Sequence, residues 1–341
     1  MTGNASYRLK DTAVLSVCAV EAPVVVTSAE FDARLMRTYE RTGMKPGMIE
    51  QLAGVTERRW WPEDVSFVDA AAMAGAKALA EAGVDPSQVG LLINTSVCRT
   101  GIEPANAVGV HDQLGLSTSC LNFDVTNACL GFLNGIQLAG TLIDAGQIDY
   151  ALLVDAEGMR GLQGDTVERL AGDDATADDL RMQFATLTLG SGAAAMVLAR
   201  ASEHSEGHRV TGGVSRSGSQ HKDLCIGSMS LMTTDSRALF NAGIELAGQT
   251  WRDALAEGWD WADADWFIAH QTSVVHLNAL ATVIGAPVDQ LPMTVPTFGN
   301  LASAAVPFTL AKQVPLLKPG QQVMLLGIGS GLNTSFAEII W

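Results

Sequence analysis

The stretch that decides the fold is Leu121-Asn-Phe-Asp-Val-Thr-Asn-Ala-Cys-Leu-Gly-Phe132. Its apolar beginning predicts a buried strand over residues 121–125, and the following residues predict a helix over 128–145, which Gly146 ends. Cys129 would then lie at a helix N-terminus, where unpaired N–H groups and the helix dipole favour negative charge. We therefore predict a thiol with a lowered pKa that acts as a nucleophile, although a small buried core residue would fit the same position.

Outward from this stretch, short apolar runs alternate with helical patterns, as in α/β proteins. The predicted strands cover residues 13–20, 89–94, 121–125, 150–155, 193–199, 266–269, 322–327 and 335–340. Further helices are predicted over 67–82, 236–257, 274–284 and 302–316, with Pro307 disturbing the last one. The two parts of the chain have a similar order of strands and helices. We therefore expect an internal duplication, with halves at residues 1–201 and 202–341 and a polar joint over 202–209.

Three other segments carry groups suited to chemistry. Trp266-Phe-Ile-Ala-His-Gln-Thr-Ser273 delivers His270 from the end of a strand, where α/β folds place their active sites, whereas His276 and the other four histidines have no such setting. In Thr297-Phe-Gly-Asn300, the turn places an amide that can donate a hydrogen bond. The glycine-rich Gly327-Ile-Gly-Ser-Gly331 can present backbone N–H groups to an oxyanion. Read one at a time, the histidine also fits a buried core position and the asparagine an ordinary turn.

The composition narrows the class of protein further. Apolar residues make up 48% of the 341 residues and charged residues 17%, which predicts a globular protein. The formal net charge of −16 argues against nucleic-acid or anionic-membrane partners. The polar N-terminal segment and the lack of a long apolar run predict a cytoplasmic protein without an integral membrane segment. The five cysteines are odd in number and contain no C-x-x-C pair, so we expect buried thiols and no metal site.

Together, the four reactive segments resemble the thiolase superfamily, in particular its ketoacyl synthase III branch. Cys129, His270 and Asn300 stand in the family's order, and 300 − 270 = 30 residues separate the last two, as suits that branch. The resemblance runs over almost the whole chain. It implies a thiolase fold, with two pseudo-repeated α/β halves in a five-layered αβαβα arrangement. It also implies Cys129 as the acyl-accepting nucleophile, with the backbone N–H groups of Cys129 and Ser330 as the oxyanion hole.

Within this branch the chain is most similar to OleA-type enzymes, through Gly90-LLINTSV, FDVTNACLGFLNG, IDYALLVD, LTLGSGAAAMV and GIGSGLN. These enzymes condense two long-chain acyl-CoA molecules head to head into a 2-alkyl-3-ketoalkanoic acid for olefin or β-lactone biosynthesis. The resemblance implies that His270 and Asn300 stabilise an enolate. It also implies that Glu103, 129 − 103 = 26 residues before Cys129, reaches the partner's site in a homodimer as a base. No cofactor is implied beyond the CoA of the substrate, and downstream olefin-pathway enzymes are possible partners.

Two alternatives remain open at this point. A decarboxylating ketoacyl synthase III would use a malonyl thioester, from which loss of CO₂ makes the enolate without a base. A partner subunit of a heterodimeric condensing enzyme would only complete a dimer. The presence of both Cys129 and Glu103 in one chain favours a self-sufficient homodimer. A thiolase proper is set aside, because the segment Gly327–Gly331 lacks that family's second cysteine.

Overall fold

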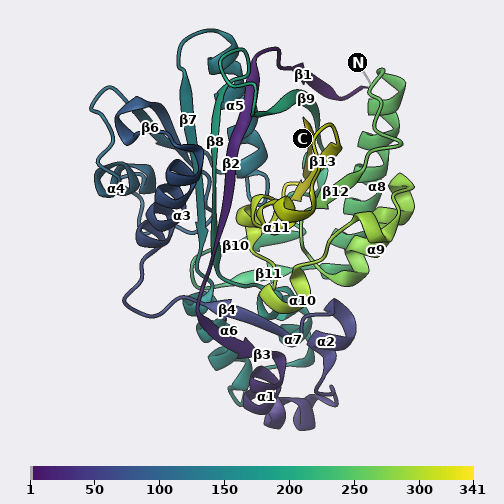
Figure 1. The fold of residues 1–341 in the computed structure, drawn as a ribbon. Coiled ribbons are helices and arrows are strands. Elements are labelled where there is room, and N and C mark those ends of the chain that lie inside the picture. The colour runs from purple at the N-terminus through teal and green to yellow at the C-terminus, as the bar shows by residue number, and fades with distance from the viewer. Residues whose placement is uncertain (1–2) are drawn as a thin grey trace.

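The computed structural model describes residues 3–341, in which ten strands form one mixed sheet (Figure 1). The strand order is β12-β13-β14-β9-β2-β8-β7-β5-β6, and β1 pairs with β9. In chain order the strands are β1 (Ala5–Arg8), β2 (Thr12–Glu21), β5 (Val89–Asn94), β6 (Leu121–Asp124), β7 (Tyr150–Glu157), β8 (Gly192–Arg200), β9 (His208–Ser217), β12 (Trp266–Ala269), β13 (Gln322–Gly329) and β14 (Asn333–Ile340).

The same pairing pattern occurs twice in this sheet. In the first half, β2 is antiparallel to β8, β8 is antiparallel to β7, and β7 is parallel to β5. In the second half, β9 is antiparallel to β14, β14 is antiparallel to β13, and β13 is parallel to β12. The two halves join where β2 pairs with β9. This repeated pairing supports our proposed division between residues 201 and 202, in the connection from β8 to β9.

Helices cover both outer faces of the sheet and fill the space between its halves. The helices α5 (Gly131–Asp144) and α11 (Ala305–Gln313) pack in the middle, where Phe132 and Leu310 share a core with Leu153 and Leu325 of the two half-sheets. The outer faces are covered by α3 (Phe67–Ala82) on one side and by α8 (Ser236–Ala256) and α9 (Val274–Ile284) on the other (Figure 1). The arrangement is therefore the five-layered αβαβα expected from the sequence.

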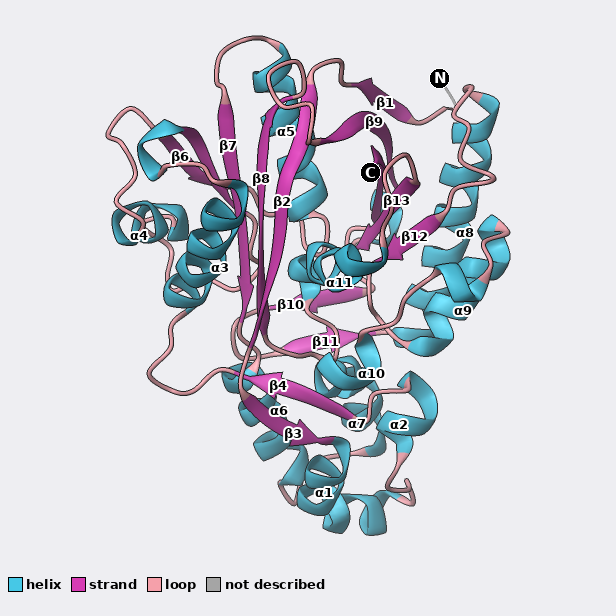
Figure 2. Cartoon of the chain, viewed as in Figure 1, coloured by secondary structure: helices cyan, strands magenta, loops and turns pink. Residues whose placement is uncertain are grey.

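A smaller region extends from one end of these layers (Figure 2). It contains two antiparallel strand pairs, β3 (Val24–Thr27) with β4 (Glu57–Trp60), and β10 (Cys225–Gly227) with β11 (Met232–Thr234). Its helices are α1 (Ser28–Thr42), α2 (Met48–Ala53), α6 (Arg160–Ala171) and α7 (Ala177–Gln183). The remaining helices of the described chain include α4 (Asn106–Gln113), beside α3, and α10 (Val295–Phe298), which packs on β4. No helix within residues 3–341 has the length and apolar character needed to cross a bilayer.

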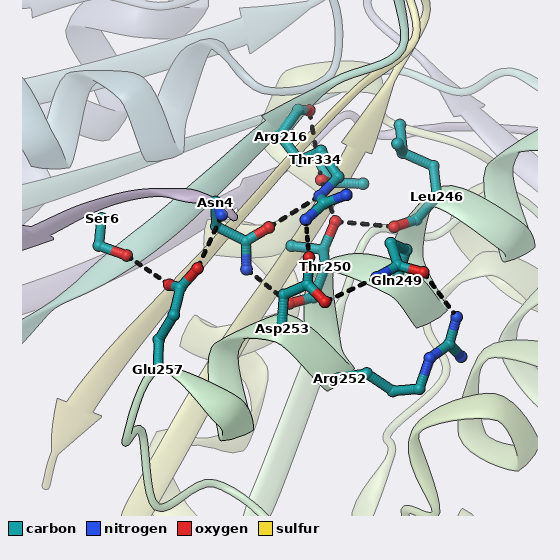
Figure 3. Close-up of polar contacts among 10 residues, drawn as sticks. All are labelled: Asn4, Ser6, Arg216, Leu246, Gln249, Thr250, Arg252, Asp253, Glu257 and Thr334. Carbon is teal, nitrogen blue, oxygen red and sulfur yellow. Dashed lines mark hydrogen bonds and ion pairs between the residues drawn. The ribbon is translucent and has the colours of Figure 1, made fainter. Parts of the chain in front are cut away.

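A polar network ties the N-terminal segment to α8 and β9 (Figure 3). Arg216 of β9 forms an ion pair with Asp253 of α8, and its Nε donates to Asn4 Oδ1 at 2.8 Å. The Asn4 Nδ2 group donates to the carbonyl oxygen of Thr250 at 2.8 Å, and Glu257 accepts from the Asn4 backbone N–H at 2.7 Å. The network thus fixes the outer helix of the second half against its sheet.

All eight predicted strands are present, whereas two helix predictions need correction. The helix after Cys129 begins at Gly131 rather than at residue 128, because residues 127–130 form a tight turn in which Leu130 N–H donates to Asn127 O at 2.9 Å. The segment predicted as one helix over 302–316 is α-helical only over Ala305–Gln313, with 3₁₀ turns at both ends. The predicted polar joint also ends earlier, since β9 begins at His208.

Candidate active site

A cavity of about 1480 Å³ lies where the two halves meet the smaller region. Its walls include Cys129, His270, Asn300 and Ser330, so the structure brings together four residues that are far apart in the sequence. The first comes from the N-terminal half and the other three from the C-terminal half. Most of the exposed cavity wall is apolar, with residues such as Phe67, Phe240, Met159, Met229 and Met232. The cavity is therefore suited to an apolar ligand that meets a few polar groups.

Cys129 is presented by a strained turn between β6 and α5. The preceding Ala128 has a φ of 45°, in the left-handed region that non-glycine residues rarely adopt. The glycine-rich segment lies against this turn: a Cβ atom at Gly329 would come within 3.2 Å of the Cys129 backbone nitrogen. At Gly131, a Cβ atom would come within 2.6 Å of the Thr95 carbonyl oxygen. Glycine at position 329 therefore lets the end of β13 approach the backbone of Cys129, and glycine at position 131 lets the first turn of α5 approach Thr95.

The predicted lowering of the Cys129 pKa is wrong for the ligand-free cavity. Burial raises the pKa of the Cys129 thiol well above its usual value, and the nearby Cys225, Glu157 and Asp155 raise it further. Only the residue's own backbone N–H opposes this effect. The helix begins three residues later than predicted, and its Phe132 N–H already donates to Ser303 Oγ at 3.0 Å. The surroundings of Cys129 therefore favour the protonated thiol over the thiolate.

His270 follows directly on β12, and its backbone N–H donates to Leu326 O of β13 at 2.8 Å. Its side chain is 1% exposed, and neither ring nitrogen has a hydrogen-bond partner within residues 3–341. Burial, together with the nearby His276, lowers the pKa of His270 to about 3. At neutral pH the ring is thus uncharged, and its N–H can donate to an oxygen of a bound ligand.

Asn300 is held by its backbone as well as by its side chain. Its N–H donates to Thr188 O at 2.9 Å, and its carbonyl oxygen accepts from Gly190 N–H at 2.9 Å. Its side-chain Oδ1 accepts from Ala302 N–H at 2.9 Å. Because the oxygen is engaged in this way, the amide presents its Nδ2 donor to the cavity. His270 and Asn300 are therefore two neutral donors on the wall that also holds Ser330.

Glu103 does not join the other four residues within its own chain. It lies in an exposed loop over residues 99–105, and it does not line the cavity. The neighbouring Ile102 is 99% exposed, so an apolar side chain projects fully from the surface here. The loop lies beside β6, the edge strand of the sheet, whose Leu121 is 57% exposed. These are the features of a surface that a second protein chain covers.

Several cavity groups were not singled out from the sequence. His276, in the first turn of α9, is 6% exposed and lines the cavity with an unpartnered Nδ1. As expected, His276 does not follow a strand, but it lines the cavity from a helix. Ser273 caps that helix, and its Oγ accepts from the His276 backbone N–H at 3.1 Å. Burial lowers the pKa of His276 to about 4. Thr272 Oγ1 and the Cys225 side chain complete this polar part of the wall.

Two buried carboxyl groups also lie near Cys129, on adjacent inward positions of β7. Burial and the neighbouring Glu157 raise the pKa of Asp155 well above its usual value. Glu157 accepts backbone N–H groups from Val97 at 2.8 Å and Cys98 at 3.0 Å, which favours its charged form. Burial nevertheless raises the pKa of Glu157 too, so both carboxyl groups hold a proton more readily than exposed ones do. The sequence shows these two acidic residues one position apart, but the apolar run around them predicts only a buried strand.

The comparisons with known proteins agree with this fold and site. Residues 123–218 match the family model of 3-oxoacyl-[acyl-carrier-protein] synthase III, and residues 255–341 match that of its C-terminal domain. An acyl-CoA:acyl-CoA alkyltransferase of Xanthomonas campestris pv. campestris is 41% identical over 97% of this chain and 99% of its own. One of Shewanella oneidensis is 35% identical over 94% and 96% of the two chains.

Solved structures of Xanthomonas campestris OleA give the same result. A variant of it with bound lauric acid and lauroyl-CoA superimposes with a TM-score of 0.95 at 40% sequence identity, covering 98% of this chain and all of that one. A form with bound cerulenin has a TM-score of 0.96. The chain therefore belongs to the 3-oxoacyl-[acyl-carrier-protein] synthase III family and has its thiolase-like fold. Within that family it is an acyltransferase of the OleA type.

Proposed function

We propose that this protein condenses two long-chain acyl-CoA molecules head to head, without decarboxylation, into a 2-alkyl-3-ketoalkanoic acid. The observation that carries the proposal is the single cavity that joins Cys129, His270 and Asn300 to a mostly apolar wall. Its volume of about 1480 Å³ exceeds the roughly 300–1,000 Å³ of ordinary small-molecule pockets, as a site for two alkyl chains requires. The relatives named above act on the same class of substrate, and one holds lauroyl-CoA.

In the first step Cys129 takes up an acyl group. Its Sγ attacks the thioester carbon of the first acyl-CoA, the bond from that carbon to the CoA sulfur breaks, and CoA leaves as the thiol with the cysteine's proton. The backbone N–H groups of Cys129 and Ser330 hold the oxyanion. The exposed Arg34 and Arg237 on the cavity wall are positioned for the phosphate groups of CoA, in a chain whose net charge is −16.

In the second step the α-carbon of another acyl-CoA becomes the nucleophile. Its thioester oxygen accepts hydrogen bonds from His270 and Asn300, each of which stabilises the developing enolate by about 3 kcal/mol. Glu103 of the partner subunit takes the α-proton. The carbanion attacks the acyl carbon on Cys129, whose sulfur leaves. Water then cleaves the CoA thioester, giving CoA and the free β-keto acid that olefin-pathway enzymes would consume.

The exposed loop around Glu103 supports the homodimer in this scheme. Within one chain Glu103 has no ligand to act on, because it lies outside the cavity that holds Cys129. Its loop lies next to the edge strand β6, which a second copy can extend across a two-fold axis. A symmetric dimer of this kind would place each Glu103 towards the other subunit.

Product analysis with one long-chain acyl-CoA as the only substrate tests the proposal. We expect the β-keto acid, or the ketone that it forms by losing CO₂, built from two acyl chains. A product that forms only when a malonyl thioester is supplied would instead establish the decarboxylating alternative. Full activity of the purified Cys129→Ala variant would show that Cys129 is not the nucleophile.

A further inference from the structure

The exposed loop over residues 99–105 is anchored at both ends by buried polar groups. Its outer residues, including Ile102 and Glu103, face solvent. The flanking Cys98 and Asn106, in contrast, are each 4% exposed. A loop with this contrast has a fixed base and a tip that the rest of the chain does not support. The position of Glu103 is therefore set by the groups at the base.

Asn106, the first residue of α4, closes the loop with its side chain. Its Oδ1 accepts from the Thr100 backbone N–H at 3.3 Å and from Thr100 Oγ1 at 2.9 Å. Its Nδ2 donates to the Cys98 carbonyl oxygen at 3.0 Å. The oxygen and the nitrogen of the Asn106 amide thus bind Thr100 and Cys98, which are six and eight residues earlier in the chain, on the other side of Glu103.

Asp124, at the end of β6, also fixes the corner at the junction between the loop and α4. Its Oδ2 accepts from the Asn106 N–H at 3.0 Å, and its Oδ1 accepts from the Ala107 N–H at 2.9 Å. The carboxylate therefore caps the first turn of α4, where such a charge is favourable. Asn94 Nδ2 orients it with a bond to Oδ1 at 3.1 Å.

The same corner is linked to the nucleophile. Asp124 stands five residues before Cys129, and between them Thr126 Oγ1 accepts from Arg99 Nη2 in the loop at 2.9 Å. On the other side, Glu157 accepts from the Val97 and Cys98 N–H groups at the start of the loop. The elements that present the cysteine thus also hold the base of the loop that presents the glutamate.

We propose that Asn106 and Asp124 are positioning residues that set Glu103 in the partner subunit's site, an inference that rests on the proposed function. They contact no reacting atom, and act only through the geometry of the loop. A shift of about 1 Å in a group that abstracts a proton can lower its rate about 100-fold. Because Glu103 serves only the second step, loosening the loop lowers condensation and leaves the acylation of Cys129 intact.

Measuring the two steps separately in Asn106→Ala tests this inference. Acylation is followed as CoA released in a single turnover with lauroyl-CoA, and condensation as β-keto acid formed at saturating lauroyl-CoA. We expect acylation at the wild-type rate and condensation lowered about 100-fold. Thr100→Val removes one bond of the same corner at an exposed position, so it tests the inference without a risk to folding; we expect a smaller loss in condensation alone. Asp112→Asn, exposed on α4 and outside this corner, is the matched control and should match the wild type in both steps.

Combining variants separates the positioning role from a general structural one. Glu103→Gln combined with Asn106→Ala should be no slower than Glu103→Gln alone, because both changes remove one function. The positioning role is wrong if Glu103→Gln blocks condensation while Asn106→Ala and Thr100→Val do not, or if acylation falls in parallel with condensation. If Glu103→Gln itself condenses at the wild-type rate, the proposed base is wrong instead, and the inference falls with it.

Discussion

Unpartnered polar atoms gather on the wall of the cavity that contains Cys129. Both ring nitrogens of His270, Nδ1 of His276 and Oγ1 of Thr272 are buried without a hydrogen-bond partner in the described chain, and all belong to one short segment after β12. Buried polar groups in folded proteins are almost always paired. A cluster of exceptions on a cavity wall therefore marks the groups that a bound ligand completes. This supports the placement of the enolate oxygen beside His270.

The buried His276 makes a prediction about stability and pH. Burial lowers its folded-state pKa to about 4, so between pH 4 and about 6.5 the unfolded chain binds a proton there that the folded chain does not. The stability associated with the neutral, buried His276 ring is therefore fully present above about pH 6.5 and is lost as the pH falls. Urea titrations at pH 7 and pH 5 measure how much stability each protein loses over this range. We expect the wild type to lose about 2 kcal/mol more of its free energy of unfolding than His276→Gln does. Equal losses in both proteins would contradict the assigned burial effect.

Single residues were predicted from the sequence where their local setting was enough. Cys129, His270 and Asn300 each follow a strand or turn that the pattern reveals, and their order gives the family. The protonation state of Cys129 was not predictable, because its burial and the carboxyl groups of Asp155 and Glu157 belong to the assembled cavity. The bounds of α9 were predicted correctly, but the inward position of His276 depends on how that helix packs against the cavity.

Apolar runs identified the central elements of the fold, since both β12 and β5 have the bounds that the pattern indicated. The strand β9 was missed because its sequence, HRVTGGVSRS, has glycines and polar residues instead of an apolar run. Its glycines have a packing reason: a Cβ atom at Gly213 would come within 2.2 Å of Phe336 O on β14. The helices α1, α2, α6 and α7 were not predicted, although α1 buries Phe31, Leu35 and Tyr39 at helical spacing, a signal that the sequence carries.

The joint between β9 and α8 is an element whose strength can be tested. The side chains of Arg216 and Asp253 are only 18% and 22% exposed, so removing the carboxylate leaves a mostly buried guanidinium with fewer acceptors (Figure 3). We expect Asp253→Ala to lower the free energy of unfolding by about 1–3 kcal/mol, measured in urea. The ion pair of Lys222 with Asp223 is well exposed, and Asp223→Ala should change stability by less than about 0.5 kcal/mol. Equal effects of the two variants would contradict the structural role of the network.

At the scale of the whole molecule, the active site depends on the duplication. The two half-sheets have the same pairing pattern, but only the first supplies the cysteine, whereas the second supplies His270, Asn300 and Ser330. The cavity at their junction is then closed by the smaller region, which carries Arg34, whereas Arg237 comes from α8 of the second half. A second copy of the chain completes the set in our proposal by adding Glu103.

Mixing two inactive variants tests this division between subunits. Cys129→Ala lacks the nucleophile and Glu103→Gln lacks the base, so each homodimer should fail to condense acyl-CoA. After co-refolding, mixed dimers contain one site with both groups intact, if Glu103 acts in the partner subunit. We expect condensation activity to return in the mixture, and to be absent when each variant is refolded alone. A mixture that contains mixed dimers but stays inactive would contradict the exchange of Glu103 between subunits.

The most direct measurement of the central claim is the mass of the product formed from two differently labelled substrates. The protein is given equal amounts of unlabelled and uniformly ¹³C-labelled lauroyl-CoA, with no malonyl thioester. If both halves of the product come from acyl-CoA, three mass classes form, and the class with one labelled and one unlabelled chain is the most abundant. The Cys129→Ala variant should form none of them. Product that carries only one acyl chain, or no product at all without a malonyl donor, would contradict the account.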